Sequence, residues 1–179
     1  MNNLTDDIAV RARTIATLLT RRQQKLVTAE SCTGGLIASA LTALPGSSAW
    51  FDRGWVTYSN HAKTDALGVD PALILSQGAV SEPVATAMAQ GALNAAQTDY
   101  ALSVTGIAGP DGGTLEKPVG TVCFAWSGSD GTRVETQHFS GNRERIREQS
   151  VAFALGGLIA LLLDSPEPGN CHAGSDITD

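Results

Sequence analysis

A short stretch of small polar residues, at positions 29–35, carries the side chains best suited to chemistry. It reads Ala-Glu-Ser-Cys-Thr-Gly-Gly and lies between an apolar run typical of a strand and a helical pattern of small residues. Turns after strand ends hold ligands in α/β proteins, and free N–H groups at a helix start favour an anion or a developing oxyanion. Ser31 is therefore a candidate nucleophile. The residues leave an equal alternative, in which Ser31 or Thr33 only caps the helix.

A cysteine directly follows this serine and is the competing nucleophile. The pKa of a thiol at a helix amino terminus is often lowered, which would favour a reactive Cys32. Against this, adjacent residues in a turn point in different directions, and a lone cysteine is more often a small buried apolar residue than a catalyst. We therefore rank Cys32 second.

A serine nucleophile needs a neighbouring group that accepts its proton. None of the three histidines stands in a recognisable triad pattern; they are His61, His138 and His172. A lysine kept neutral by burial or by nearby positive charge is the other option. Lys63 follows a predicted strand and could accept the Ser31 proton, with Tyr58 as a relay. The alternative is that Lys63 is a solvated surface charge, as most lysines are.

Two further segments have the composition of an anion site. Residues 105–113 form a glycine-rich loop that lacks the P-loop lysine and the glycine spacing of a dinucleotide fold. Its N–H groups could still surround a single phosphate. Arg143, Arg145 and Arg147 open a predicted helix, where positive charge opposes the helix dipole unless an anion lies nearby. Both segments equally fit a surface loop without a ligand and a solvated turn paired with acidic neighbours.

The apolar pattern predicts helices and strands that would position these segments. Helical spacing or propensity marks residues 4–24, 34–44, 60–67, 84–96 and 143–163. Strand patterns mark residues 26–29, 55–58, 100–105, 120–126 and 133–139. The last two strands, joined by a longer turn over 127–132, predict an antiparallel hairpin. The predicted fold is a single-domain, three-layer α/β/α sandwich with a mixed sheet.

Length and composition suit one folded domain: 179 residues, of which 42% are hydrophobic and 17% charged. The net charge of -6 would repel a phosphate backbone, so no nucleic-acid partner is expected. The amino terminus lacks the pattern of a secretory signal and no apolar run reaches membrane-spanning length, so a cytoplasmic protein without a membrane partner is expected. The cysteines have no metal-ligand spacing, so we expect free thiols and no metal; they are Cys32, Cys123 and Cys171.

Four segments together resemble one known family. They are the stretch 29–35, Tyr-Ser-Asn-His-Ala-Lys at 58–63, the loop 105–113 and Lys-Pro-Val-Gly-Thr-Val at 117–122. In order and spacing they are similar to the carboxy-terminal domain of CinA-type competence/damage-inducible proteins, over roughly residues 4–163. Stand-alone members are nicotinamide-nucleotide amidases, which convert nicotinamide mononucleotide (NMN) to nicotinate mononucleotide and ammonia. The resemblance implies this activity, with no cofactor.

The resemblance also implies roles for individual residues. The family's catalytic serine falls on Ser31 and its lysine on Lys63, and its active-site tyrosine and threonine fall on Tyr58 and Thr105. The residues implied to bind the substrate are Thr33, Gly34, Gly35, Asn60, Gly106, Ala108, Gly109 and Arg145. In the resulting hypothesis, Ser31 attacks the carboxamide carbon while N–H groups around Thr33 and Gly34 hold the oxyanion. The glycine loop and Arg145 would bind the phosphate.

The sequence places a CinA-type amidase domain at 1–164 and an acidic tail at 165–179, whose composition is typical of disorder. The low charged fraction and the alanine-rich segment 84–96 leave room for contacts between copies, so we expect a homo-oligomer, a dimer. Other functions stay open. The pocket could belong to a nucleotide sensor or partner-binding module without turnover, to a Cys32-dependent amidase, or to a hydrolase for another phosphorylated amide or a pyrophosphate link.

Overall fold

The computed structural model describes residues 4–165 of the chain. Its helices are α1 (Leu4–Arg22), α2 (Leu36–Thr42), α3 (Asn60–Leu67), α4 (Pro71–Gln77), α5 (Glu82–Ala96) and α6 (Arg143–Asp164), with a 3-10 turn η1 (Ser47–Ala49). Its strands are β1 (Leu26–Glu30), β2 (Phe51–Val56), β3 (Tyr100–Gly106), β4 (Thr121–Gly128) and β5 (Gly131–His138). The strands form one five-stranded sheet in the order β2-β1-β3-β4-β5.

The sheet is mixed, as predicted. Strand β1 runs parallel to β2 and β3, whereas β4 runs antiparallel to β3 and β5. The predicted hairpin is confirmed, but its turn is shorter than expected because pairing continues to Gly128 and Gly131. Gly131 has a φ of 114°, a conformation that glycine adopts at little cost and that permits so tight a turn.

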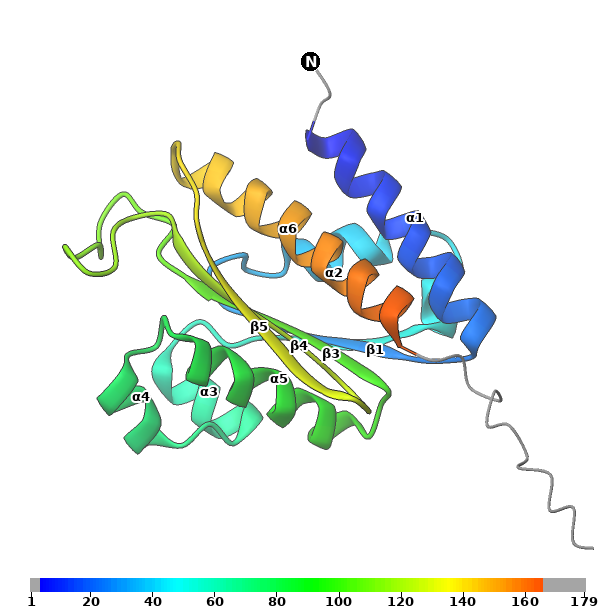
Figure 1. The fold of residues 1–179 in the computed structure, drawn as a ribbon, viewed down its shortest axis with the longest axis horizontal. Helices are drawn as coiled ribbons and strands as arrows, with labels where there is room; N and C mark the ends of the chain where they lie inside the picture. The colour runs from blue at the N-terminus through cyan, green and yellow to red at the C-terminus, as the bar shows by residue number, and fades with distance from the viewer. Residues whose placement is uncertain (1–3, 166–179) are drawn as a thin grey trace, which may run out of the picture.

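Helices cover both faces of the sheet, with α1, α2 and α6 on one side and α3, α4 and α5 on the other (Figure 1). Strand side chains alternate between the two cores. Leu102 and Phe124 pack in the core beneath α1 and α6, while Ala101 and Ala125 face α5. The three-layer α/β/α architecture predicted from the sequence is therefore confirmed.

Helix α6 is seated closely against α1 and β4. A side chain at Gly156 would collide with the Arg11 guanidinium, and one at Gly157 with the Trp126 ring. The Trp126 Nε1 donates to the Ala154 carbonyl at 2.8 Å. By length and composition α6 would also suit a membrane span, but half of its most apolar stretch is buried inside the protein. It packs as the core helix of a globular domain.

Two elements differ from the sequence prediction. Strand β2 begins at Phe51 and ends at Val56, so Tyr58 follows the strand instead of closing it. It is an edge strand in which four of the six residues are exposed, Asp52 and Arg53 among them, which weakens the apolar signal. Helix α4 was not predicted, although Asp70 caps it by accepting from a backbone N–H, and Pro71 suits the first helical position.

The carboxyl end of α6 is tied to α1. The Ser165 N–H donates to the Leu161 carbonyl at 3.0 Å, and the Ser165 carbonyl accepts from Arg22 Nη2 at 3.2 Å. The predicted tail thus starts at a buried residue. Its continuation over 166–179, with Cys171, lies outside the described residues.

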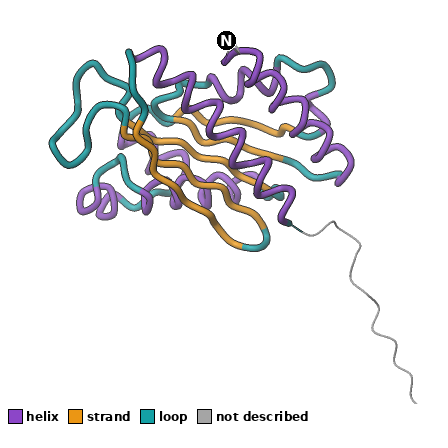
Figure 2. Tube along the Cα trace, turned by 45° about the horizontal axis from the view of Figure 1, so that its top comes forward, coloured by secondary structure: helices purple, strands orange, loops and turns teal. Residues whose placement is uncertain are grey.

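The loops after the parallel strands meet at one edge of the sheet. Strand β1 leads into residues 31–35, β2 into 57–59 and β3 into 107–120. Parallel strands end at the same edge, where α/β proteins bind ligands. The loop 107–120 projects beyond the sheet in both views (Figure 1 and Figure 2). This edge holds the side chains considered next.

Candidate active site

Ser31 is the first residue after β1 and is 8% exposed. Its N–H donates to the Val104 carbonyl of β3 at 2.9 Å, which holds the serine against the sheet. The turn continues through Gly34 and Gly35, whose φ angles of 62° and 93° lie in the left-handed region that favours glycine. The Gly34 N–H donates to the Ser31 carbonyl at 3.0 Å. The predicted strand, turn and helix are confirmed.

A buried carboxylate anchors this turn. Glu30 is 0% exposed, and its Oε2 accepts from the N–H groups of Gly35 at 3.0 Å and Ile37 at 3.1 Å. Its Oε1 accepts from the Ala38 N–H at 2.8 Å. These donors lie at the start of α2, where unpaired N–H groups and the helix dipole favour negative charge. This role was not predicted, although an acidic residue at the end of an otherwise apolar strand was a signal for it.

Lys63 of α3 points at the serine. Its Nζ lies 3.0 Å from Ser31 Oγ and 2.8 Å from the Thr57 carbonyl oxygen, and the side chain is 1% exposed. Burial lowers the pKa of the Lys63 ammonium, because the charged form loses its hydration. A neutral amine donates to the Thr57 carbonyl and can accept the Ser31 hydroxyl proton. The structure thus brings the predicted nucleophile and the predicted base together.

The neighbouring thiol has the opposite character. Cys32 is 5% exposed, and burial raises its pKa to about 12. The nearby Glu30 carboxylate also raises this pKa, because its negative charge disfavours a thiolate. The prediction that the helix start lowers the Cys32 pKa is therefore wrong. Its thiol is protonated at neutral pH.

Tyr58 lies at the same edge but is 59% exposed. Its hydroxyl accepts a hydrogen bond from Arg143 Nη2 at 2.6 Å, and Arg143 Nη1 donates to the Gly109 carbonyl at 2.8 Å. Over residues 4–165 no hydrogen bond joins Tyr58 to Ser31 or Lys63, so a relay through Tyr58 stays a prediction. The arginine links the tyrosine to the glycine loop, a role that the sequence analysis did not assign.

Thr105 ends the buried part of β3 and is 1% exposed. Its Oγ1 donates to the Ala79 carbonyl at 2.8 Å, which ties the strand to the segment before α5. A Cβ at Gly106 would lie 2.7 Å from a valine methyl of β4, and one at Gly109 would lie 2.6 Å from a valine methyl of the loop itself. Close packing accounts for these glycines without a ligand. The substrate-binding roles of Gly106, Ala108 and Gly109 stay predictions.

The three arginines at the start of α6 face different surroundings. Arg143 and Arg147 are four residues apart and share one face of the helix, whereas Arg145 lies on another. The Arg145 side chain is 53% exposed and lies 3.5 Å from a Glu148 oxygen. The phosphate-binding role of Arg145 stays a prediction.

Arg147 contacts the turn that carries the serine. It donates through Nε to the Cys32 carbonyl at 3.1 Å and through Nη2 to the Thr33 carbonyl at 2.8 Å. From the sequence, Arg147 was predicted only as one of three basic residues at the start of a helix. Its spacing of four residues from Arg143 places both on one helix face, and this spacing could have distinguished Arg147 from Arg145.

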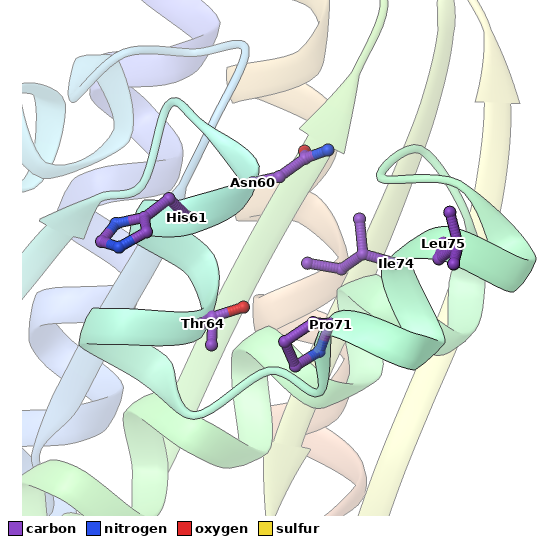
Figure 3. Close-up of a pocket in the computed structure, with 6 residues that line it drawn as sticks. All are labelled: Asn60, His61, Thr64, Pro71, Ile74 and Leu75. Atoms are coloured by element: carbon purple, nitrogen blue, oxygen red, sulfur yellow. The ribbon is translucent and has the colours of Figure 1, made fainter.

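Asn60 borders a groove of about 420 Å³ between α3 and α4. The lining residues are drawn in Figure 3 and are Asn60, His61, Thr64, Pro71, Ile74 and Leu75. Ser31 and Lys63 do not line this groove, which shares only Asn60 with the predicted site. In the described part of the chain no three His, Cys, Asp or Glu side chains are grouped as a metal site requires.

A family model described as the CinA C-terminal domain matches residues 9–162. The chain belongs to the CinA C-terminal domain family. One relative, the nicotinamide-nucleotide amidohydrolase PncC of Enterobacter agglomerans, is 61% identical over 129 residues, covering 71% of this chain and 78% of the relative. PncC of Escherichia coli K12 is 54% identical over 138 residues, covering 76% and 84%. The resemblance seen in the sequence is confirmed.

A solved structure gives the same answer for the fold. The competence/damage inducible protein CihA from Agrobacterium tumefaciens superposes with a TM-score of 0.85 at 48% identity. The match covers 87% of this chain and 95% of that protein. The five-stranded mixed sheet with helices on both faces is thus shared with a CinA-family structure.

Proposed function

We propose that this CinA-family chain is a nicotinamide-nucleotide amidase, which hydrolyses the carboxamide of NMN to nicotinate mononucleotide and ammonia. The observation that carries the proposal is the buried Lys63 Nζ, 3.0 Å from Ser31 Oγ. A hydroxyl beside an amine of lowered pKa suits an acyl-transfer nucleophile and its base. The relatives named nicotinamide-nucleotide amidohydrolase support the choice of substrate.

The first half-reaction forms an ester. The Ser31 oxygen attacks the carboxamide carbon, and its hydroxyl proton moves to Lys63 Nζ. The C–N bond of the tetrahedral intermediate then breaks while Lys63 returns the proton to the leaving nitrogen, which departs as ammonia. Water attacks the ester, Lys63 takes one of its protons, and that proton moves to the Ser31 oxygen as the ester C–O bond breaks. The carboxylic acid formed gives its remaining proton to solvent and leaves as the carboxylate. The scheme uses no metal and no cofactor.

The charge that develops on the carboxamide oxygen needs backbone donors. We expected these donors around Thr33 and Gly34. The Gly34 N–H already donates to the Ser31 carbonyl and the Gly35 N–H to Glu30, whereas the Thr33 N–H has no acceptor in the described ranges. Among the described residues the Cys32 N–H also has no backbone or carboxylate acceptor, and Cys32 is 5% exposed whereas Thr33 is 0% exposed. We therefore assign the oxyanion to these two adjacent N–H groups, with the two glycines shaping the turn.

The nucleotide end of NMN would lie across the loops of the same edge, near Asn60, Thr105 and the glycine loop. Arg145 is the phosphate ligand expected from the family. Arg143 is a second candidate, because Tyr58 and the loop already orient its guanidinium. Arginine recognition of the phosphate would favour the nucleotide over free nicotinamide. Removing the phosphate ligand should raise the Michaelis constant most.

The proposal extends to the setting of the enzyme. The amidase domain is assigned to residues 1–164, and Ser165, which the sequence placed in the tail, packs with it. The enzyme acts in the cytoplasm as a homodimer, without nucleic-acid or membrane partners. The net charge of -6 is the physical ground for excluding nucleic acid.

Ammonia release from NMN by the purified protein tests the proposal, run with a metal chelator beside Ser31→Ala and Cys32→Ala. Wild type and Cys32→Ala should release ammonia, and Ser31→Ala should not. Free nicotinamide and other phosphorylated amides in the same assay measure the preference for NMN. A wild-type protein that binds NMN without turnover would favour a nucleotide-binding module instead.

A further inference from the structure

Arg147 connects helix α6 to the nucleophile turn, residues 31–35. Its Nε donates to the Cys32 carbonyl at 3.1 Å and its Nη2 donates to the Thr33 carbonyl at 2.8 Å. A planar guanidinium presents parallel N–H donors, which suits two successive carbonyls. Among the described residues no carboxylate forms an ion pair with Arg147. The guanidinium is therefore committed to the backbone of the turn.

This contact sets the direction of one backbone N–H. A trans peptide is planar, so the C=O and N–H of one peptide group point in opposite directions. The Cys32 carbonyl and the Thr33 N–H belong to the same group, so holding the carbonyl turns the N–H away from Arg147. The next group is held at both ends, because Arg147 binds the Thr33 carbonyl and the Gly34 N–H binds the Ser31 carbonyl at 3.0 Å.

We infer that Arg147 is a positioning residue for the oxyanion site: by holding the Cys32 and Thr33 carbonyls it fixes the turn whose Cys32 and Thr33 N–H groups are the proposed oxyanion donors. Its positive charge also polarises the peptide group, which strengthens the N–H as a donor. The inference rests on the proposed function, since the oxyanion forms in that reaction. The turn is built to admit the guanidinium, because a Cβ at Gly34 would lie 3.2 Å from Arg147 Nη2.

The base and the positioning residue approach the serine from opposite layers of the fold. Lys63 comes from α3 and Arg147 from α6, and no hydrogen bond joins them over residues 4–165. Loss of Arg147 should therefore weaken stabilisation of the tetrahedral state and leave the base in place. The expected kinetic signature is a lower kcat with little change in KM and no shift in the pH midpoint.

The test compares Arg147→Lys, which keeps the charge but loses the planar fork, with Arg133→Lys as a matched control. Arg133 is an exposed arginine that pairs with Asp164 and lies outside the site. Each variant is assayed for NMN hydrolysis at a temperature where circular dichroism shows it folded. A second readout is the rate at which a fluorophosphonate modifies Ser31, followed by intact mass. In that reaction the serine oxygen displaces fluoride from phosphorus. Its rate therefore measures the reactivity of Ser31 and the strength of the oxyanion donors without NMN.

Removing a direct oxyanion donor lowers kcat by roughly a hundredfold to a thousandfold, so we expect a loss of about tenfold to a hundredfold for Arg147→Lys. The labelling rate should fall in parallel, while Arg133→Lys stays at the wild-type rate. A folded Arg147→Lys protein with wild-type kcat and labelling rate would overturn the inference, as would a change in KM alone. If wild type is labelled but does not hydrolyse NMN, the proposed substrate is wrong and the labelling rates alone decide the role of Arg147.

Discussion

Replacing Glu30 by glutamine tests whether a buried carboxylate holds the nucleophile turn. Glutamine has nearly the same shape, so the change creates no cavity. It exchanges one acceptor oxygen for an NH2 group that can only donate. The three N–H groups of Gly35, Ile37 and Ala38 point at the two Glu30 oxygens, so one amide orientation cannot satisfy them all.

The cost follows from these contacts. The better orientation keeps the amide oxygen at the Oε2 position, which retains the bonds from Gly35 and Ile37 and leaves the Ala38 N–H facing a donor. An unsatisfied buried donor costs about 1–3 kcal/mol. The two retained bonds lose their charge assistance, which makes them roughly half as strong. Together these effects predict a loss of about 3 kcal/mol in the free energy of unfolding.

For a chain of this size, 1 kcal/mol shifts the melting temperature by roughly 2–4 °C, so Glu30→Gln should melt about 6–12 °C lower. Thermal unfolding followed by circular dichroism measures the shift, and Glu116→Gln on an exposed loop is the matched control. Activity should also fall, because the same contacts fix the turn that holds Ser31. A Glu30→Gln protein that melts within a degree of the control would refute this account of the turn.

Three further outcomes are expected. Only a neutral Lys63 accepts the Ser31 proton, and burial lowers its pKa, so kcat/KM for NMN should rise with pH through a midpoint below the ordinary lysine value of 10.5. A midpoint at or above 10.5 would contradict this. Burial raises the Cys32 pKa to about 12, so iodoacetamide should modify this thiol much more slowly in the folded than in the unfolded protein, and equal rates by peptide mapping would exclude that environment. A Cβ at Gly106 would lie 2.7 Å from a side-chain atom and 3.0 Å from backbone atoms of β4. Gly106→Ala should therefore lower the free energy of unfolding by about 1–3 kcal/mol. Urea denaturation measures this loss, and an unchanged midpoint would contradict the tight packing.

The arrangement around Ser31 could be predicted because each step in it is local. An apolar run, a polar turn with two glycines and a helical pattern follow one another within a few residues, and periodicity detects such elements. The same holds for α3, where Ser59 caps the helix by accepting from the Ala62 N–H at 3.0 Å. Neither pattern shows that Lys63 reaches Ser31, which lies 32 residues earlier in the chain. From the sequence, Lys63 was a candidate base with a solvated surface charge as the alternative, the family resemblance favoured the base, and the structure supplied the distance.

The remaining contacts of the site join residues far apart, which explains why sequence patterns did not separate them. Arg147 reaches Cys32 across 115 residues, and Arg143 reaches Tyr58 across 85. Composition alone made the arginines of α6 look equivalent. Only the rotation of the helix against the sheet decides which of them faces the turn. The shortened hairpin loop and the early start of β2 were missed for a related reason, since strand pairing extends into residues of low strand propensity.

The glycine pair of α6, Gly156 and Gly157, fixes the position and rotation of this helix against the sheet. The Trp126 ring comes too close to Gly157 for a side chain there, and the Arg11 guanidinium lies against Gly156, so this pair marks where along its axis the helix packs. Arg147 lies more than two turns earlier, and each residue of an α-helix advances 1.5 Å and rotates about 100°. Inserting or deleting one residue between Arg147 and the glycine pair would keep the packing at the glycines but move the guanidinium to another side of the helix. Family members in which an arginine binds the carbonyls of the nucleophile turn should therefore keep the same number of residues between that arginine and the glycine pair.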